Sequence, residues 1–120
     1  MESLQPSPIK PLISFADVEK LDVRVGTIVR VDQVKGSDKL LKLTVDFGDH
    51  QRTILAGMKQ ERERPQEVAG RQALFVVNLA PKKMMGETSE GMLFDIGYAD
   101  GLTPALAVPE RRVPNGARAG

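Results

Sequence analysis

A polar segment between two apolar runs concentrates side chains suited to contacting an anionic polymer. It extends from Asn78 to Met92 and carries the adjacent cations Lys82 and Lys83 and the hydroxyl of Ser89. Ammonium groups pair with phosphate, and amide or hydroxyl groups hydrogen-bond to phosphate oxygens and ribose 2′-hydroxyls, which distinguish RNA from DNA. Because strand-like runs enter and leave the segment, we expect a binding loop positioned by a rigid sheet. The alternative is a solvated hairpin loop rich in charge.

Four further cations are expected on elements that adjoin this loop. Lys39 and Lys42 lie in or just after the first interstrand loop, and Arg24 and Arg52 lie on adjoining predicted strands. Together with the loop lysines they would form one basic patch. With about four to six phosphate contacts, affinity falls by roughly two to three decades between about 50 and 200 mM salt. Taken singly, each cation is also explained by a solvated surface charge.

The residues give no support for catalysis. Gly86 and Gly91 have the spacing of the glycines in a phosphate-binding loop, but a Met-Leu pair replaces the Lys-Ser/Thr that such a loop needs. The carboxylates of Glu87 and Glu90 have no catalytic partner beside them. The chain lacks cysteine and has one histidine, His50, which excludes a disulfide, a thiolate metal site and a histidine cluster. We therefore expect a binding protein with no catalytic residues, metal or cofactor.

Length and charge indicate one small domain. The 120 residues are enough to bury roughly two thirds of the unfolded surface in an independent core. The formal charge of +1 says little about partners, because 17 Lys and Arg sorted to one face can still bind an anion. With no leader-like segment after Met1 and no apolar run long enough to cross a bilayer, we expect a cytoplasmic protein without membrane contact.

The elements that must hold these side chains begin after a proline-containing lead-in. Residues 1–12 contain three prolines without periodicity and are predicted to be flexible or extended. Ser14 and Asp17 have the spacing of a helix-capping pair. This pair predicts a short helix whose apolar side chains, from Phe15 to Leu21, pack on the domain.

Three strands are predicted next. Alternating side chains over residues 22–32 indicate a long first strand, in which Gly26 suggests a bulge or sharp bend. The second strand is expected over residues 41–47 and the third over residues 51–57, joined by a hairpin turn. At the tip of that hairpin, His50 is predicted to be solvated rather than catalytic.

A charged crossover separates the third strand from the fourth. Residues 58–70 contain Pro65 and end in glycine, which predicts a loop with a short helix. Within them, the run Glu61–Arg64 is predicted to be a solvated face. Residues 71–79 are predicted to form a fourth strand that is apolar on both faces and therefore covered on both sides. The fifth strand is predicted over residues 91–98.

Five short strands with one helical crossing between the third and the fourth are the element order of an OB-fold. We expect an all-β domain with short helices, built as a five-stranded Greek-key barrel with an N-terminal helix. Such barrels bind oligonucleotides or oligosaccharides across their second and third strands and through their loops. A fold alone does not establish function, so the residues must decide.

Several motifs in this sequence resemble the tRNA-binding domain family. In chain order they are LDVRVGTI at Leu21–Ile28, GSDKLLKL at Gly36–Leu43, Gly70-Arg71, VNLAPKKM at Val77–Met84 and GETSEGM at Gly86–Met92. The resemblance covers about residues 13–115, in order and at the expected spacings. The family includes stand-alone bacterial tRNA-binding proteins, the C-terminal dimerisation domain of many methionyl-tRNA synthetases, and domains of the endothelial-monocyte-activating polypeptide type.

This resemblance implies an OB-fold tRNA-binding domain over residues 13–120, a homodimer formed through the end regions with a C-terminal dimerisation extension, and recognition of folded tRNA by shape. It also implies an aminoacyl-tRNA synthetase as a further partner. The positions that match the family's nucleic-acid-binding face are Lys39, Asn78, Ser89 and Met92. From the residues alone, Asn78 and Ser89 are also consistent with tying the loop to backbone groups, and Met92 with core packing.

Aromatic content favours recognition of structured RNA over single strands. Single-strand binders of this fold stack successive bases on exposed rings. The chain has no tryptophan, and Phe15, Phe47, Phe75 and Phe94 are all predicted to face a core, which leaves Tyr98 as the candidate platform. Backbone and shape contacts with folded RNA are therefore expected.

Two alternative functions lie within the same superfamily. An export-related chaperone of this fold would hold unfolded peptides on a broad exposed apolar patch. Members of that branch tend to lack the GSDKL signature at Gly36–Leu40 and carry Ser-Glu-Val in place of Ser89-Glu-Gly91, so both motifs favour the tRNA-binding branch. The other alternative is a dimerisation module that tethers a synthetase, with RNA binding secondary. Residues 1–12 and Glu61–Arg64 lie outside the family motifs, and either is a candidate for a separate partner site.

Overall fold

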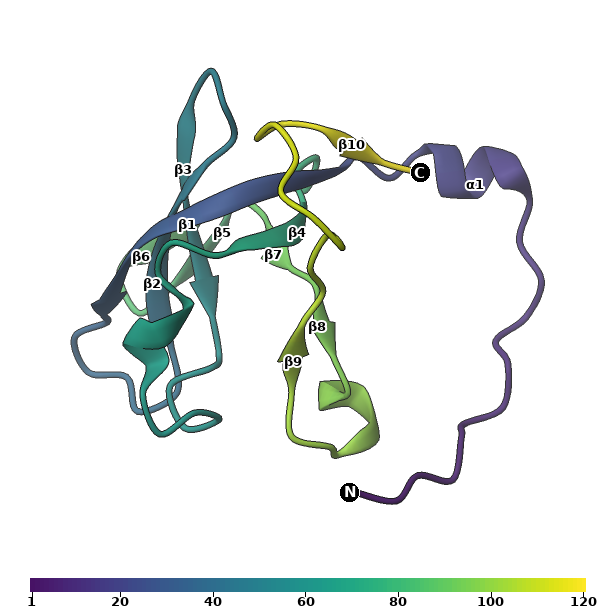
Figure 1. Ribbon diagram of the computed structural model, residues 1–120, viewed down its shortest axis with the longest axis horizontal. Helices are drawn as coiled ribbons and strands as arrows, with labels where there is room; N and C mark the ends of the chain where they lie inside the picture. Colours follow the sequence, from purple (N-terminus) through teal and green to yellow (C-terminus); the bar gives the residue numbers. More distant parts are fainter.

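The first strand organises the sheet because it is long enough to pair with two partners. A computed structural model describes all 120 residues. In it β1 (Val23–Gln33) pairs antiparallel with β4 (Gln72–Val76) through its first half and with β2 (Leu41–Asp46) through its second half. With β3 (Gln51–Ala56) beyond β2 and β7 (Met92–Leu93) beyond β4, the order is β3-β2-β1-β4-β7 in one curled sheet (Figure 1). The predicted succession along the chain, three strands, a helical crossing and a fourth strand, is confirmed.

The outer edges of this sheet meet through the link between β6 (Glu87–Ser89) and β7. The backbone N–H of Glu90 donates to the Thr53 carbonyl at 2.8 Å, and the Thr53 N–H donates to Glu90 Oε1 at 3.1 Å. The N–H of Leu55 donates to Ser89 Oγ at 3.0 Å. Side-chain acceptors therefore supply part of the ladder that closes the sheet into a small barrel. The all-β, OB-like fold expected from the sequence is confirmed.

Alternate side chains of the strands fill this barrel. Ile28, Leu43, Ile54 and Phe75 are completely buried, one from each of four strands. The Phe75 ring meets Phe47 edge-to-face with centroids 5.5 Å apart. Burying a side chain of this size stabilises the fold by roughly 1.5–3 kcal/mol. The period-two pattern of the sequence marks the inner face correctly in β2, whereas in β1 the core is reached by Ile28 and Val31, which the alternation placed on opposite faces.

One residue of β1 departs from the predicted alternation. The register with β2 shifts between Ile28 and Arg30, so the bulge lies at Val29, which is 42% exposed. The bulge expected at Gly26 is wrong. Gly26 pairs regularly with β4, and a Cβ at this position would come within 2.5 Å of Val45 Cγ1. The glycine is needed for close packing inside the barrel.

Helix α1 (Phe15–Glu19) has the predicted cap but not the predicted packing. Ser14 Oγ accepts a hydrogen bond from the Asp17 N–H at 3.2 Å, and the Asp17 carboxylate accepts one from the Ser14 N–H at 3.4 Å. The apolar side chains stay at the surface, with Phe15 89% and Val18 50% exposed. Figure 1 shows α1 standing apart from the barrel. The expectation that the helix packs on the domain and that Phe15 faces a core is wrong.

The charged crossover contains the expected short helix, η1 (Pro65–Val68), which buries Val68 against the barrel. Of the run Glu61–Arg64, only Glu63 and Arg64 form the predicted solvated face. The side chains of Glu61 and Arg62 are only 11% and 14% exposed. Alternating Glu and Arg have no apolar period and therefore predict a surface run, yet the crossover folds the first two of these residues inward.

The polar segment after β4 folds as a hairpin rather than as an irregular loop. Strand β5 (Lys82–Met84) pairs with β6 across the two-residue turn Met85-Gly86. Met85 has φ 52° and Gly86 has φ 80°, the positive values of a type I′ turn. The lysines are therefore carried by a regular strand whose direction is fixed by the ladder.

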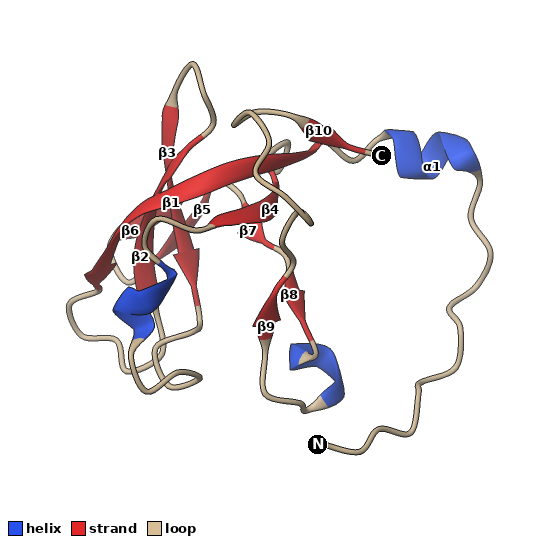
Figure 2. Cartoon of the chain, in the orientation of Figure 1, coloured by secondary structure: helices blue, strands red, loops and turns tan.

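The predicted fifth strand, residues 91–98, divides into two pieces. After β7 the chain leaves the barrel as β8 (Asp95–Ile96), which pairs with β9 (Ala105–Leu106). This ribbon carries η2 (Tyr98–Asp100) at its tip (Figure 2). The chain then returns along the barrel, and β10 (Arg118–Ala119) pairs with the start of β1. None of the helices has the length and apolar character needed to span a membrane.

Candidate nucleic-acid interface

A hollow of about 430 Å³ opens beside the first interstrand loop. Lys39 and Leu40 line it from the loop, Met85 from the hairpin turn, and Tyr98 from η2. The hydroxyl of Ser37 holds the loop by accepting hydrogen bonds from the N–H groups of Lys39 and Leu40, at 3.3 and 3.0 Å. Lys39 is thus presented by an ordered turn.

A second hollow, of about 570 Å³, lies between the end of β3, strand β5 and the β7–β8 segment. It includes Lys82 and Met92 from the predicted site, together with Phe94 and Asp95. Phe94 is half-buried here rather than part of the core. Two of the nine predicted binding residues therefore line the same hollow.

The two hollows adjoin, because both are lined by Gly57 and Tyr98. We call them together the Tyr98 recess, lined by Gly36–Leu40, Leu55–Gly57, Glu61, Lys82, Met85, Met92–Asp95 and Tyr98–Ala99. Tyr98 is 68% exposed between them. Lys39 and Lys82 are exposed and make no ion pair within the chain, so both ammonium groups are available to an external anion.

The other two predicted lysines differ in their surroundings. Lys42 Nζ lies 3.5 Å from Glu87 Oε1, so its charge is partly balanced within the fold. Lys83 is exposed without an ion pair. Because successive side chains of a strand point to opposite faces, Lys83 lies on the opposite face of β5 from Lys82 and does not line the recess.

Neither predicted arginine lines the recess. Arg24 forms a two-pronged ion pair with Asp22, with contacts of 2.9 and 3.0 Å, which lowers the pKa of Asp22 and raises the pKa of Arg24. Arg52 Nη1 donates to the carbonyls of Val77 and Glu90 at 2.7 and 3.1 Å. Arg52 therefore ties β3 to the two ends of the hairpin segment and holds the barrel together.

The polar groups of Asn78 and Ser89 also form hydrogen bonds within the chain. Asn78 Oδ1 accepts from the Asp22 N–H at 2.9 Å, and its amide donates to the Lys20 carbonyl at 2.7 Å. Ser89 is 4% exposed, and its hydroxyl accepts from Leu55 and donates to the Gly91 carbonyl. In this structure both side chains tie the hairpin segment to backbone groups, which is the alternative to RNA contact that their residue types left open.

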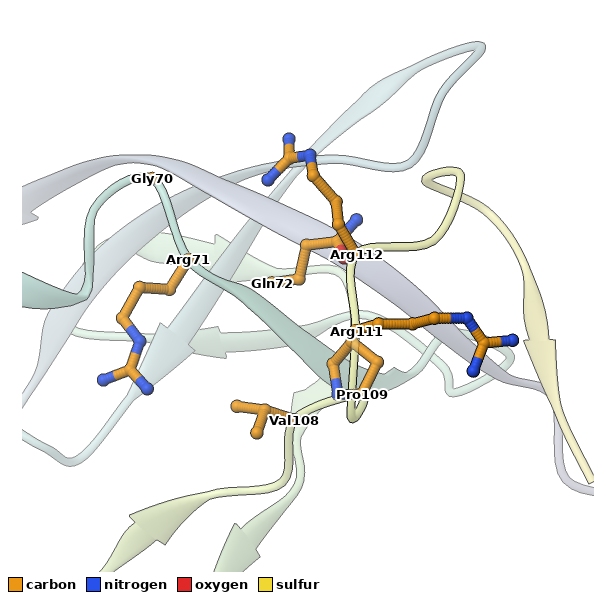
Figure 3. A pocket seen from close by; sticks show the side chains of 7 residues that line it. All are labelled: Gly70, Arg71, Gln72, Val108, Pro109, Arg111 and Arg112. Atoms are coloured by element: carbon orange, nitrogen blue, oxygen red, sulfur yellow. The ribbon is translucent and has the colours of Figure 1, made fainter.

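A third hollow brings together cations that the sequence analysis did not select as site residues. Arg71, the residue before β4, lies near Arg111 and Arg112 of the C-terminal segment, around Gln72. Figure 3 shows their guanidinium groups pointing away from one another, so the three do not converge on one ligand. Gln72 fixes this arrangement through bonds to Val113. The sequence carried no signal for it, because the fold alone brings these distant segments together.

Two acidic residues of the Tyr98 recess were also missed. Glu61 Oε2 and Asp95 Oδ1 are sealed from solvent, and neither has a hydrogen-bond partner. Arg62 Nη1, at 3.9 Å from Glu61 Oε2, gives a loose ion pair. Burial raises the pKa of both carboxyls, and the charge of Asp95 raises the pKa of Glu61 further. The recess therefore combines cations with deeper carboxyl groups.

Comparison with known protein families identifies the family of this domain. The profile described as "Putative tRNA binding domain" matches residues 23–118. The chain belongs to the tRNA-binding domain family. The match spans the whole barrel and every predicted site residue, so the resemblance inferred from the motifs is confirmed.

Relatives of this tRNA-binding domain include parts of synthetases. A methionine–tRNA ligase of Parabacteroides distasonis is 42% identical over 109 residues, which cover 91% of this chain and 16% of the ligase. The chain thus spans only 16% of the length of that relative. A MetRS-related protein from Pyrococcus horikoshii superposes with a TM-score of 0.85 at 35% identity, covering 92% of this chain and 100% of that chain.

The same fold occurs in a protein of a different kind. The chaperone CsaA from Bacillus anthracis superposes with a TM-score of 0.77 at 26% identity, covering 92% of this chain and 100% of that chain. Backbone shape and length are therefore shared by a synthetase-related protein and a chaperone. The residues of the recess must discriminate between the two functions.

Proposed function

We propose that this domain binds folded tRNA as a homodimer and recognises its shape and backbone without catalysing a reaction. The observation that carries the proposal is the Tyr98 recess, where the unpaired lysines Lys39 and Lys82 lie in adjoining hollows that share an exposed tyrosine. Membership of the tRNA-binding domain family supports tRNA as the polyanion.

Lysine contacts suit recognition of a phosphate backbone. An ammonium group is a point charge that positions a nucleic acid without reading its sequence. The proposed contact residues are Lys39, Lys82 and Lys83, with Tyr98 and Met92 against a ribose or base. The remaining predicted residues act indirectly in this proposal, since their polar groups hold the elements in place: Arg24, Lys42, Arg52, Asn78 and Ser89.

A second copy of the chain is the proposed partner of α1. Phe15, Val18 and Leu21 are 89%, 50% and 52% exposed, and contiguous exposed apolar side chains mark interaction sites. Val18 and Leu21 line one hollow with Arg118 and Gly120, so the helix and the C-terminal end of the chain lie at one edge of the molecule (Figure 1). A two-fold interface there would bury both end regions.

Binding of purified protein to folded bulk tRNA, unstructured RNA, duplex DNA and a denatured polypeptide, at two salt concentrations, tests the function. We expect preference for folded tRNA that weakens with salt and with Lys39→Ala and Lys82→Ala. Lys10→Ala is the matched control, because Lys10 is exposed, makes no ion pair and lies in the lead-in. Equal binding of all nucleic acids, or no effect of the two recess substitutions, would contradict the proposal.

A peptide-holding chaperone is the second candidate, favoured by the likeness to CsaA and by the exposed side chains of α1. Tight binding of the denatured polypeptide with no preference for RNA would establish it instead. An aminoacyl-tRNA synthetase is a proposed further partner, because the chain matches a segment of methionine–tRNA ligases. The proposed place of action is the cytoplasm, where tRNA is charged and used.

A further inference from the structure

The larger hollow of the Tyr98 recess combines three kinds of surface. Apolar walls come from Leu55 and Met92, and an aromatic ring comes from Tyr98. Lys82 is an exposed cation at its rim. Glu61 and Asp95 bring carboxyl groups. A flat, partly apolar ligand with an attached anion and several N–H donors would match all three surfaces.

The carboxyl groups are costly for the fold as it stands. Glu61 is 11% exposed, and no group of the chain donates a hydrogen bond to its Oε2 atom or to Oδ1 of Asp95. The charge of Glu61 is compensated only by a 3.9 Å contact with Arg62, and that of Asp95 by the attraction of Arg62 and a backbone hydrogen bond from Ile96. A buried carboxyl oxygen without a donor destabilises the folded state, and such atoms are expected where a ligand completes the hydrogen bonds.

The rim discriminates between possible ligands. A lysine or arginine side chain of a peptide would be attracted by the carboxyls but repelled by Lys82. A bare phosphate would be attracted by Lys82 but repelled by Glu61 and Asp95. A nucleotide satisfies both, because its phosphate can remain at the rim while its base enters, stacks on Tyr98 and offers its Watson–Crick edge.

The geometry points to a pocket for one unstacked nucleobase of the bound RNA, with guanine favoured and uracil disfavoured. Guanine presents adjacent N1–H and N2–H donors that a carboxylate can accept together, whereas the edge of uracil presents one donor between two carbonyls. Glu61 and Asp95 are the acceptors in this assignment, and their sealed oxygens reach the base edge by rotation of the two carboxyl groups toward the hollow that both residues line. Lys82 takes the phosphate. The inference rests on the proposed tRNA-binding function and adds a base-reading element to it.

Tyr98 provides a direct probe, because the chain contains one tyrosine and no tryptophan. Titration of the full-length protein with 5′-GMP is expected to quench its fluorescence saturably, and 5′-UMP is expected to bind about tenfold more weakly. N-acetyltyrosinamide in the same titration corrects for absorption by the nucleotide. Glu61→Gln should weaken GMP binding about tenfold, while Glu63→Gln, an exposed position in the same run, should leave it unchanged.

Equal affinity for GMP and UMP, unsaturable quenching, or unchanged GMP binding by Glu61→Gln would overturn the base pocket. Tighter binding of arginine amide than of GMP would also overturn it and assign the hollow to a cationic peptide side chain. Folded tRNA titrated into the same preparation separates the two levels. Salt-dependent tRNA binding without GMP selectivity would support the proposed function and contradict the base pocket. Absence of tRNA binding would contradict the proposed function, and the GMP titration alone would then test the pocket.

Discussion

Ser89 closes the barrel onto Leu55. Its Oγ accepts a hydrogen bond from the Leu55 N–H at 3.0 Å and donates one to the Gly91 carbonyl at 3.0 Å. With 4% of its surface exposed, the side chain is part of the barrel wall. An effect of mutating Ser89 on RNA binding is therefore expected to act through the position of the β5–β6 hairpin.

Ser89→Ala is expected to lower the free energy of unfolding by about 1–3 kcal/mol, because it leaves the buried Leu55 N–H without an acceptor. Urea unfolding of the variant measures this change. Thr88→Ala, at the exposed neighbouring position, is the control and should stay within about 0.5 kcal/mol of the wild type. Unchanged stability together with lost RNA binding would show that Ser89 contacts the RNA directly.

Glu87→Gln is expected to strengthen RNA binding and steepen its salt dependence. The substitution removes the carboxylate that lies 3.5 Å from Lys42 Nζ and so frees that ammonium group for phosphate. One additional phosphate contact changes the slope of log K against log salt by about 0.7–0.9. Dissociation constants for tRNA at four salt concentrations give the slope, and adding Lys42→Ala to the variant should restore the original value. A slope that does not change would mean that Lys42 lies outside the interface.

Side-chain period predicted the inner face of β2 well, because Leu41, Leu43 and Val45 are buried and alternate with half-buried residues. In β1 the alternation grouped Val25 with Val31, whereas Ile28 and Val31 are the residues that reach the core. The bulge at Val29 could not be predicted from the sequence. Ile28 and Val29 are both apolar, so a register shift of one residue leaves the apolar pattern unchanged. The closure through Ser89 was also invisible, because a hydroxyl gives no sign of which distant N–H it will accept.

The candidate site was harder to predict than the fold. Sequence types selected Lys39 and Lys82, which the structure places in adjoining hollows, but they also selected Arg52, which the fold uses internally. Charge type alone cannot separate a free cation from a bonded one. Glu61 and Asp95 were missed for the opposite reason, since carboxylates are ordinarily solvated and their burial depends on how the crossover meets the β7–β8 segment.

Met85→Asn is expected to stabilise the protein by about 0.5–1 kcal/mol and to weaken tRNA binding. Met85 occupies the first position of a two-residue hairpin turn with φ 52°, where asparagine is favoured over an unbranched apolar residue. The methionine also lines the hollow of Lys39, so its strain is consistent with a contact to the ligand. Chemical denaturation and tRNA binding of the same variant measure the two effects. A stability gain with unchanged binding would show that Met85 does not touch the RNA.

The buried carboxyls predict how stability depends on pH. Burial raises the pKa of Glu61 and of Asp95 above their ordinary values, with a further rise at Glu61 from the charge of Asp95. Between the ordinary and the raised pKa values, the folded state therefore binds more protons than the unfolded state. The stability that these two groups contribute is fully present below their ordinary pKa and is lost as pH rises through the raised pKa. The Arg62 guanidinium offsets part of this loss because it pairs with Glu61. Lys82 and Tyr98 are titratable groups that line the same hollow.

Glu61→Gln removes one of the two titrating groups and is expected to raise the melting temperature at pH 7.5 by about 3–5 °C, with little change at pH 4. Arg62 stays compensated in the variant by Asp95, which it also attracts. Thermal unfolding at the two pH values measures the difference, and Glu63→Gln, at an exposed position, should show none. A variant that is more stable yet binds GMP more weakly would indicate that the Glu61 carboxyl serves ligand recognition at the expense of stability. If the carboxyl were purely structural, its replacement would destabilise the protein. Destabilisation at pH 7.5 would instead show that the ion pair with Arg62 outweighs the cost of burial.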